Sequence, residues 1–455
     1  MEFNESIVQS LENNIILVTG ATGYLAKLFV EKLLRVQPNV KHLFLLLRAA
    51  DASSPTQRLN KDKNMVLGSI LFISGKVTPI FGDVSLENLG IEDSDLEKKM
   101  HKEIYLVANF AATTNFNERY DVALAVNTMG AKHVLKFAEK CENLEMILHV
   151  STEMSGVILE KPPSQILKKS SKFLDIIEEE KKLMQQRLDG LKAEQVSKKQ
   201  ETAAMKELGL ERIIIGPHLK TNFPVVIVRP TTVTGTYREP FPGWIEGFNA
   251  LDPMVINVGK GQLPCFLGDY ESLFDIIPGD MVLNARIVAI VNAKANNHIY
   301  SDSDDGLIYH ISSSAHREPT TLVRLLEYAY DYFCKNPLMG RDIGEIVKPV
   351  FFPTMSSFQE HVHNNYMVNM KEDILQLAKR LAEIYEPYIL FKGVFSTSAT
   401  DQLRLRTTAY YGPGEVDIFD FDPRQIDWED YMMNIHIPGL VNYVVQPHVG
   451  YISKL

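Results

Sequence analysis

Short, wholly apolar runs alternate with segments of helical apolar spacing through the first half of the chain. The runs at 15–18 and 42–47 enclose a glycine turn and a segment, 24–36, in which apolar residues recur every three or four positions. Strand, glycine turn, helix and strand in this order predict a βαβ unit. Because the two strands are apolar at nearly every position, they are expected to be buried on both faces, as in a parallel sheet covered by helices.

The same alternation continues toward residue 230. Further strands are predicted at 77–81, 104–109, 145–150 and 225–228, and a helix at 118–141. This order predicts an α/β fold with a doubly wound parallel sheet of the Rossmann type. Beyond residue 300 the alternation is less regular, and helical spacing at 321–333 and 372–385 predicts a mainly helical C-terminal domain. We therefore expect two domains, 1–300 and 301–455.

The composition changes at about 160–210, where charged, helix-favouring residues dominate. We interpret this stretch as solvated helices inserted into the first domain. A charged arm that binds a partner is the alternative interpretation.

Charge and cysteine content narrow the functional classes. The formal net charge of −10 argues against a nucleic-acid-binding protein, which usually carries a basic excess. Cys141, Cys265 and Cys334 are far apart and odd in number, so neither a disulfide framework nor a zinc site is predicted. The N-terminus resembles neither a secretory signal nor a plastid transit peptide, and no apolar run approaches the ~18 residues of a membrane span. A cytoplasmic protein is expected, with peripheral association to the endoplasmic reticulum left open.

The glycine turn between the first strand and the first helix has the chemistry of a dinucleotide site. Gly20 permits a tight turn, Gly23 lets the backbone approach a pyrophosphate, and the helix N-terminus supplies oriented N–H groups. Ala26 replaces the usual third glycine and is small enough for close helix–strand packing. The predicted cofactor-binding residues of this turn are Thr19, Gly20, Thr22, Gly23, Tyr24 and Leu25.

The residues that follow the next three strands indicate which dinucleotide binds and how it is held. The second strand ends at Arg48, whose guanidinium suits a 2′-phosphate and favours NADPH; nearby Asp51 would suit the ribose hydroxyl of NAD. Asp83, with Val84, follows the third strand, where a carboxylate could meet the adenine amino group. The fourth strand ends at Asn109, followed by the small residues Ala111 and Ala112, which would let the backbone face the cofactor.

Several blocks of sequence resemble the plant-type, alcohol-forming fatty acyl-CoA reductases, which belong to the extended short-chain dehydrogenase/reductases. The blocks are TGATGYLAKLFVEKLLRVQPNV, LLLRAADA, GDVSLENLGI, NFAATTNFNERYDVALAVNT, HVST and RPTTVTGTYREPFPGWIEG, and the resemblance runs from about residue 12 to the C-terminus. It implies NADPH-dependent reduction of a long-chain acyl-CoA to a primary alcohol, as in wax, suberin or pollen-wall lipid synthesis.

The resemblance also implies catalytic residues. A hydroxyl after the fifth strand is present as Thr152, with Ser151 beside it. Asn127 matches the asparagine of the family's helix, and the resemblance implies that it supports the proton network of the site. The family's tyrosine, with a lysine four residues later, is expected after Arg212, but 153–228 contains no tyrosine. The pair Tyr388 and Lys392 has the required spacing, yet it lies in a C-terminal segment that is not catalytic in the family.

Three functions remain open. The chain is an acyl-CoA reductase, a catalytically inactive paralogue or truncated splice form that binds NADP or acyl-CoA, or a different extended reductase or epimerase. The EPFPGWIEG block argues against the third. The loop 238–244, which overlaps the start of this block, is either an acyl-channel wall or a rigid connector, and Lys260 and Arg317 are candidates for CoA phosphates. The close pair His361 and His363 lacks a third ligand, so no metal site is predicted. The oligomeric state is left open.

Overall fold

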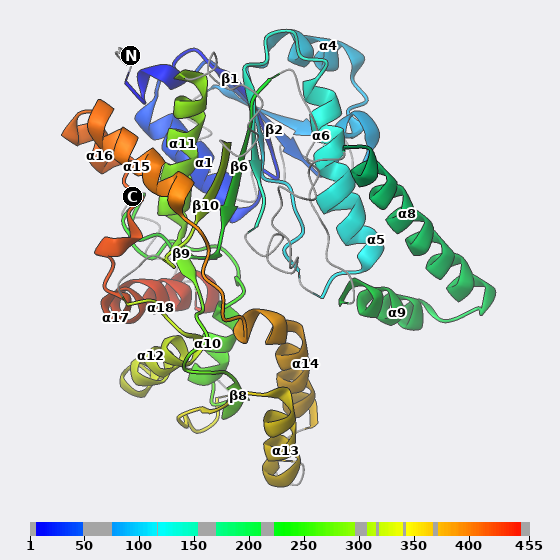
Figure 1. Cartoon of the computed structure of the whole chain (residues 1–455), viewed down its shortest axis with the longest axis vertical. Coiled ribbons are helices and arrows are strands. Elements are labelled where there is room, and N and C mark those ends of the chain that lie inside the picture. Colours follow the sequence, from blue (N-terminus) through cyan, green and yellow to red (C-terminus); the bar gives the residue numbers. More distant parts are fainter. Residues whose placement is uncertain are drawn as a thin grey trace. The chain divides into compact units, whose positions relative to one another are not determined.

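A computed structural model of the chain describes residues 6–48, 75–115, 117–152, 170–210, 223–295, 307–314, 318–339, 343–366 and 372–446. The chain forms two compact units (Figure 1). Unit 1 comprises Met1–Val228 and Ala289–Ile308, and unit 2 comprises Arg229–Val288 and Tyr309–Leu455. This partition differs from the single boundary expected near residue 300, because 229–288 clusters with the C-terminal residues.

Unit 1 is built on the parallel sheet that the apolar runs predict. Its strands are β1 (Ile15–Thr19), β2 (His42–Leu47), β3 (Val77–Phe81), β4 (Leu106–Asn109) and β5 (Met146–Val150), followed by β6 (Val225–Pro230). β10 (Ile308–Ile311) is the last strand of the same sheet, and both β6 and β10 extend past the boundary of unit 1, at Val228 and Ile308. The strand order is β10-β6-β5-β4-β1-β2-β3, and the pairings from β3 through β6 are all parallel. This is the doubly wound order, so the predicted fold class is confirmed.

The helices of unit 1 cover the sheet with apolar faces. They include α1 (Tyr24–Val36), α4 (Ser94–Glu103) and α6 (Gly130–Ala138). Phe137 of α6 shares one buried cluster with Leu17 of β1 and Val107 of β4. Burying such side chains drives the layers together, at roughly 1.5–3 kcal/mol for each large aliphatic or aromatic group.

The predicted helix at 118–141 is three elements rather than one. α5 (Tyr120–Ala123) leads into a π-helical turn, η4 (Leu124–Met129), which continues into α6. A π-helical turn inserts an extra residue into the helix, and such turns are frequent at functional sites. Apolar spacing predicted the helix but not this interruption.

The charged insertion forms two helices that pack on α5, namely α8 (Ser170–Ala193) and α9 (Lys198–Leu210) (Figure 1). Leu191 and Met205 form a small buried cluster with Tyr120 and Leu124. Arg119 bonds to Asp121 and to Glu201 of α9, each at 3.0 Å. The hydrogen bond to Asp121 is the main cause that raises the pKa of Arg119. The predicted helices are therefore present, and one side of them is docked rather than solvated.

Unit 2 holds two small sheets and most of the remaining helices. The sheets pair β7 (Thr232–Thr234) with β9 (Ile276–Pro278) and β11 (Val350–Phe352) with β8 (Cys265–Leu267). The predicted helices at 321–333 and 372–385 are α12 (Leu322–Lys335) and α14 (Glu372–Ile389). The others are α10 (Asp252–Gly259), α13 (Met355–Tyr366), α15 (Ser398–Tyr410), α16 (Pro413–Ile418), α17 (Trp428–Asp430) and α18 (Ile437–Leu440), with π-helical η8 (Tyr431–His436) and η9 (Val441–Val445).

One helix belongs to both units. α11 (Gly279–Ala295) begins in unit 2, and its last residues, from Ala289, belong to unit 1. None of the described helices is both long and apolar enough to cross a bilayer.

Removing the Met205 side chain should loosen the docked insertion. Met205 is fully buried, so Met205→Ala leaves a cavity and should cost about 2–5 kcal/mol of unfolding free energy. Glu207→Ala, on an exposed position of the same helix, is the matched control and should change stability by less than about 0.5 kcal/mol. Chemical denaturation measures both, and equal stability losses would contradict the docking.

Candidate functional site

The carboxyl ends of β1 and β4 lie side by side at the point where the strand order reverses. Thr19 is in register with Leu46 of β2 on one side and with Asn109 of β4 on the other. From β1 the chain proceeds outward to β2 and β3, and from β4 outward to β5 and β6. Ligands of doubly wound sheets bind in the crevice outside the carboxyl ends at such a switch point.

Gly20 makes the turn after β1 possible. Its φ is +63°, in the left-handed region that favours glycine. A Cβ atom at this position would stand 2.7 Å from both the backbone N and Cα of Ala111, which follows β4. The turn after β1 and the segment after β4 therefore lie so close together that only glycine, which has no Cβ atom, fits at position 20. This confirms the tight turn that the sequence predicts at Gly20.

Gly23 opens α1 and leaves its N-terminus suited to an anion. Gly23 is exposed, and its N–H donates to the carbonyl of Gly20 at 2.9 Å. Among the described residues no side chain caps this helix, and its first turn holds no acidic residue. Oriented N–H groups and an uncompensated positive dipole end fit a phosphate group. Thr22, Tyr24 and Leu25 are half-buried around this turn.

Thr19 and Asn109 lie beneath the turn instead of facing the surface. Both side chains are buried, and the Thr19 hydroxyl donates to Asn109 Oδ1 at 2.5 Å. The N–H of Ala111 donates to Thr19 Oγ1 at 3.3 Å, and Ala112 beyond it is exposed. The contacts show these two residues bracing the turn, and their predicted contact with a cofactor stays a prediction.

The residues after β2 and β3 occupy the expected edge. Arg48 follows β2 and is exposed, whereas Asp51 lies outside the described residues. Asp83 is half-buried, and its Oδ1 accepts the N–H of Ser85 at 2.8 Å. Val84 is buried against Gly130 of α6. Asp83 therefore has one carboxylate oxygen committed to its own loop, and Val84 is a packing residue of the same loop.

The predicted catalytic residues approach the edge from β5 and the π-helical turn. Ser151 follows β5, is half-buried and donates its N–H to the carbonyl of Val228, and Thr152 is exposed. Asn127 lies within η4 and holds the peptide of Thr113: its Oδ1 accepts the Thr113 N–H at 2.8 Å and its Nδ2 donates to the Thr113 carbonyl at 3.1 Å. Asn127 thus fixes the loop that follows β4, a contact that the expected proton network did not include.

The Tyr388 and Lys392 pair does not have the electrostatics of a catalytic pair. Burial raises the pKa of Tyr388, whereas a catalytic lysine should lower it. Lys392 Nζ is 2.8 Å from Asp269 Oδ2, and this hydrogen bond is the main cause that raises its pKa. The segments 153–169 and 211–222, which belong to the interval where the family's tyrosine is expected, lie outside the described residues, as does Arg317.

The remaining candidates lie in unit 2. The ring centroids of His361 and Phe352 lie 4.5 Å apart, with the rings tilted by 36°. The described residues contain no group of three metal-ligating side chains. The loop 238–244 is rigidly held, because buried Asp280 accepts the N–H groups of Tyr237, Arg238 and Glu239. Burial raises the pKa of Asp280 against the opposing effect of those three N–H donors. Whether this loop lines an acyl channel stays a prediction.

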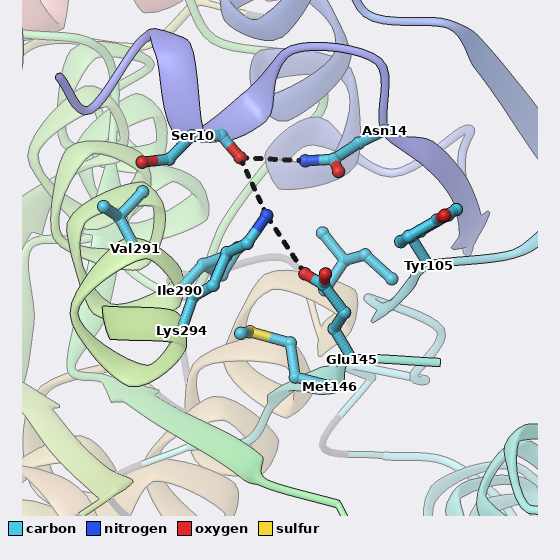
Figure 2. Close-up of a pocket in the computed structure, with 9 residues that line it drawn as sticks. Ser10, Asn14, Tyr105, Glu145, Met146, Ile290, Val291 and Lys294 are labelled. Carbon is cyan, nitrogen blue, oxygen red and sulfur yellow. Dashed lines mark hydrogen bonds and ion pairs between the residues drawn. The ribbon is translucent and has the colours of Figure 1, made fainter. Parts of the chain in front are cut away.

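A small pocket at the opposite edge of the unit 1 sheet is not the cofactor site. Figure 2 shows Asn14, Tyr105 and Glu145, which precede β1, β4 and β5, around its mouth. Lys294 Nζ lies 3.1 Å from Glu145 Oε2 and donates to the carbonyl of Ser10 at 3.4 Å. An ion pair therefore occupies this edge, and the glycine turn is at the other end of the strands.

Replacing Gly20 should abolish the site while a matched glycine should not. Gly20→Ala places a methyl group within 2.7 Å of the Ala111 backbone, so we expect binding of a nicotinamide cofactor to fall below detection in a fluorescence titration. Gly75 has a nearly identical φ of +60° but nothing within 4 Å of its would-be Cβ. Gly75→Ala should lose about 1 kcal/mol of stability and keep cofactor affinity. Unchanged binding in Gly20→Ala would refute the site.

Comparison with known proteins identifies the family. An NAD-binding family described as "Male sterility protein" matches residues 18–286, and a second family of the same description, Sterile, matches residues 364–447. "Probable fatty acyl-CoA reductase 4" of Arabidopsis thaliana is 41% identical over 97% of this chain and 100% of its own length. "Alcohol-forming fatty acyl-CoA reductase" of Simmondsia chinensis is 39% identical over 98% and 100%.

Solved structures agree on the fold. The terminal R domain from the myxalamid biosynthetic pathway has a TM-score of 0.58 at 15% identity, covering 96% of this chain and 92% of its own. The reductase domain of a nonribosomal peptide synthetase from Mycobacterium tuberculosis has a TM-score of 0.57 at 17% identity, with the same coverage. With matches over nearly its whole length, the chain belongs to the fatty acyl-CoA reductase family of male sterility proteins.

Proposed function

We propose that this protein is an alcohol-forming fatty acyl-CoA reductase that uses NADPH. The observation that carries the proposal is the full-length similarity to the Simmondsia enzyme, whose name states this activity. The glycine turn at the switch point supports it, because Gly20 and the open N-terminus of α1 fit the pyrophosphate of a dinucleotide. The substrate, a long-chain acyl-CoA, follows from the same similarity.

The choice of NADPH over NADH rests on Arg48. Its exposed side chain follows β2, where a guanidinium can bond to the 2′-phosphate that distinguishes the two cofactors. The competing carboxylate, Asp51, is three positions further along the chain.

The chemistry requires two hydride transfers at one carbonyl carbon. Each transfer would use the hydride of one NADPH, so two NADPH molecules would be consumed in turn for each acyl-CoA. The thioester oxygen becomes an oxyanion that needs hydrogen-bond donors, and we assign this role to the hydroxyls of Thr152 and Ser151 after β5. Asn127 would keep the loop after β4 in place while the thiolate leaves and the aldehyde is reduced.

A second function is favoured by one specific observation, the lack of any tyrosine in 153–228. The comparison with the Arabidopsis relative runs over 506 residues, more than the 455 of this chain, so the relative carries segments with no counterpart here. A chain that lacks the tyrosine-bearing segment would bind NADPH or acyl-CoA without reducing the acyl group, since the tyrosine normally donates the proton to the oxygen of the reduced carbonyl.

Expression in a host that makes no fatty alcohol separates the two functions. A reductase should yield primary alcohols in the extracted lipids, and the Gly20→Ala variant should yield none. Soluble protein that binds NADPH but produces no alcohol would reject the reductase and leave the binding function. Soluble protein that binds neither cofactor nor acyl-CoA would reject both.

Arg48→Ala should weaken NADPH binding at least about tenfold and leave NADH binding within about twofold, because only the 2′-phosphate contact is removed. Intrinsic fluorescence titrations with both cofactors provide the comparison. Arg35→Ala is the control, since this arginine is exposed and pairs with Glu31 within α1. An equal loss for both cofactors would show that Arg48 does not select between them.

The cellular location is also a proposal. The sequence favours the cytoplasm and leaves peripheral association to the endoplasmic reticulum open, while one relative, 33% identical, is named as chloroplastic. Imaging of a C-terminal fluorescent fusion in plant cells would distinguish these compartments.

A further inference from the structure

Three polar side chains form a row across the carboxyl ends of three neighbouring strands. Thr19 of β1 is in register with Asn109 of β4, and Asn109 is in register with His149 of β5. Two residues earlier, the same strands carry Leu17, Val107 and Ile147, all members of one buried apolar cluster. Because side chains alternate between faces, the polar row continues this apolar stripe on the same face. We call Thr19, Asn109 and His149 the polar row.

The hydrogen bonds of the polar row have a definite direction. The contact between Thr19 Oγ1 and Asn109 Oδ1 is 2.5 Å, which lies in the range of O–H···O bonds and is too short for N–H···O. The Asn109 amide therefore points its oxygen to Thr19 and its NH2 group to His149. Asn109 Nδ2 donates to His149 Nδ1 at 3.0 Å, so Nδ1 is the acceptor and the neutral ring carries its proton on Nε2.

One end of the row reaches the turn that receives the cofactor. Thr19 Oγ1 accepts the N–H of Ala111, and the Ala111 backbone is the surface against which Gly20 closes. At the other end, His149 is two residues before Ser151, which follows β5. The polar row thus connects the strand that precedes the Ser151 and Thr152 hydroxyls with the glycine turn that is predicted to hold the phosphates.

We propose that His149 is a positioning residue of the cofactor site. By accepting from Asn109, it fixes the amide that orients the Thr19 hydroxyl, which in turn holds the Ala111 backbone against Gly20. Without this acceptor, the buried Asn109 NH2 group loses a partner and the amide rotates or draws in water. The proposal rests on the proposed function, since the affinity of the nicotinamide cofactor is the property that His149 controls.

Two polar substitutions of His149 separate positioning from simple loss of a side chain. An asparagine amide can place an acceptor near the position of Nδ1, whereas a glutamine amide reaches the position of Nε2. We expect His149→Asn to bind NADPH within about twofold of the unaltered protein, and His149→Gln to bind about tenfold more weakly. A residue of general structural importance would give equal losses in both variants, and that result would overturn the proposal.

A control and a second readout complete the test. His42 is also a strand histidine, with Nε2 2.8 Å from Thr78 Oγ1 at the amino end of β2, so His42→Gln should leave NADPH affinity unchanged. Hydrogen exchange without cofactor reports on the row directly: the Ala111 amide should exchange about tenfold faster in His149→Gln than in His149→Asn. Equal exchange of the Ala111 amide in the two variants would overturn the role of His149, whether or not the protein binds a cofactor. If the unaltered protein bound no cofactor, that finding alone would reject only the proposed function.

Discussion

The geometry of the candidate site depends on the close approach of two backbone segments. The turn after β1 and the segment after β4 meet at Gly20 and Ala111, at a separation that leaves no room for a Cβ atom. Only glycine satisfies both this separation and the left-handed backbone of the turn. The parallel register of β1 and β4 brings the segments together, so the sheet and the turn are parts of one constraint. The N-terminus of α1 is presented to solvent as a result.

The fold was largely predictable because its signals are strong and local. Strands such as 42–47 are apolar at almost every position, which few other structures tolerate, and β2 has those bounds in the structure. The interruption of the helix at 124–129 was not predictable in this way. A π-helical turn changes the hydrogen-bond partners of a few residues but keeps apolar residues such as Leu124 facing inward. The single boundary near residue 300 differs from the structure because spacing along the chain does not show that 229–288 packs with later residues.

The places of the candidate residues along the strands were predictable, and the hydrogen bonds between their side chains were not. The glycine turn, the end of the second strand and the family resemblance placed Gly20, Arg48 and Thr152 after strand ends, and each of them follows a strand in the structure, while their roles stay predictions. The order of the motifs along the chain predicts that Thr19 and Asn109 contact the cofactor. In the structure their side chains are buried and hydrogen-bonded to each other. His149 received no role, although a signal existed: three adjacent strands of an apolar core carry a polar residue at the same register, at the last position of β1 and β4 and one position before the end of β5.

The interleaving of the two units constrains how the protein is made. The chain leaves unit 1 at Arg229, returns to it at Ala289 and leaves again at Tyr309, with α11 spanning the second crossing. A ribosome must therefore release residue 308 before the amino-terminal unit can be complete, although most of that unit has emerged long before. During this interval its partly assembled sheet exposes an unpaired edge, so translation speed and chaperone access over 229–308 should govern the yield of native protein.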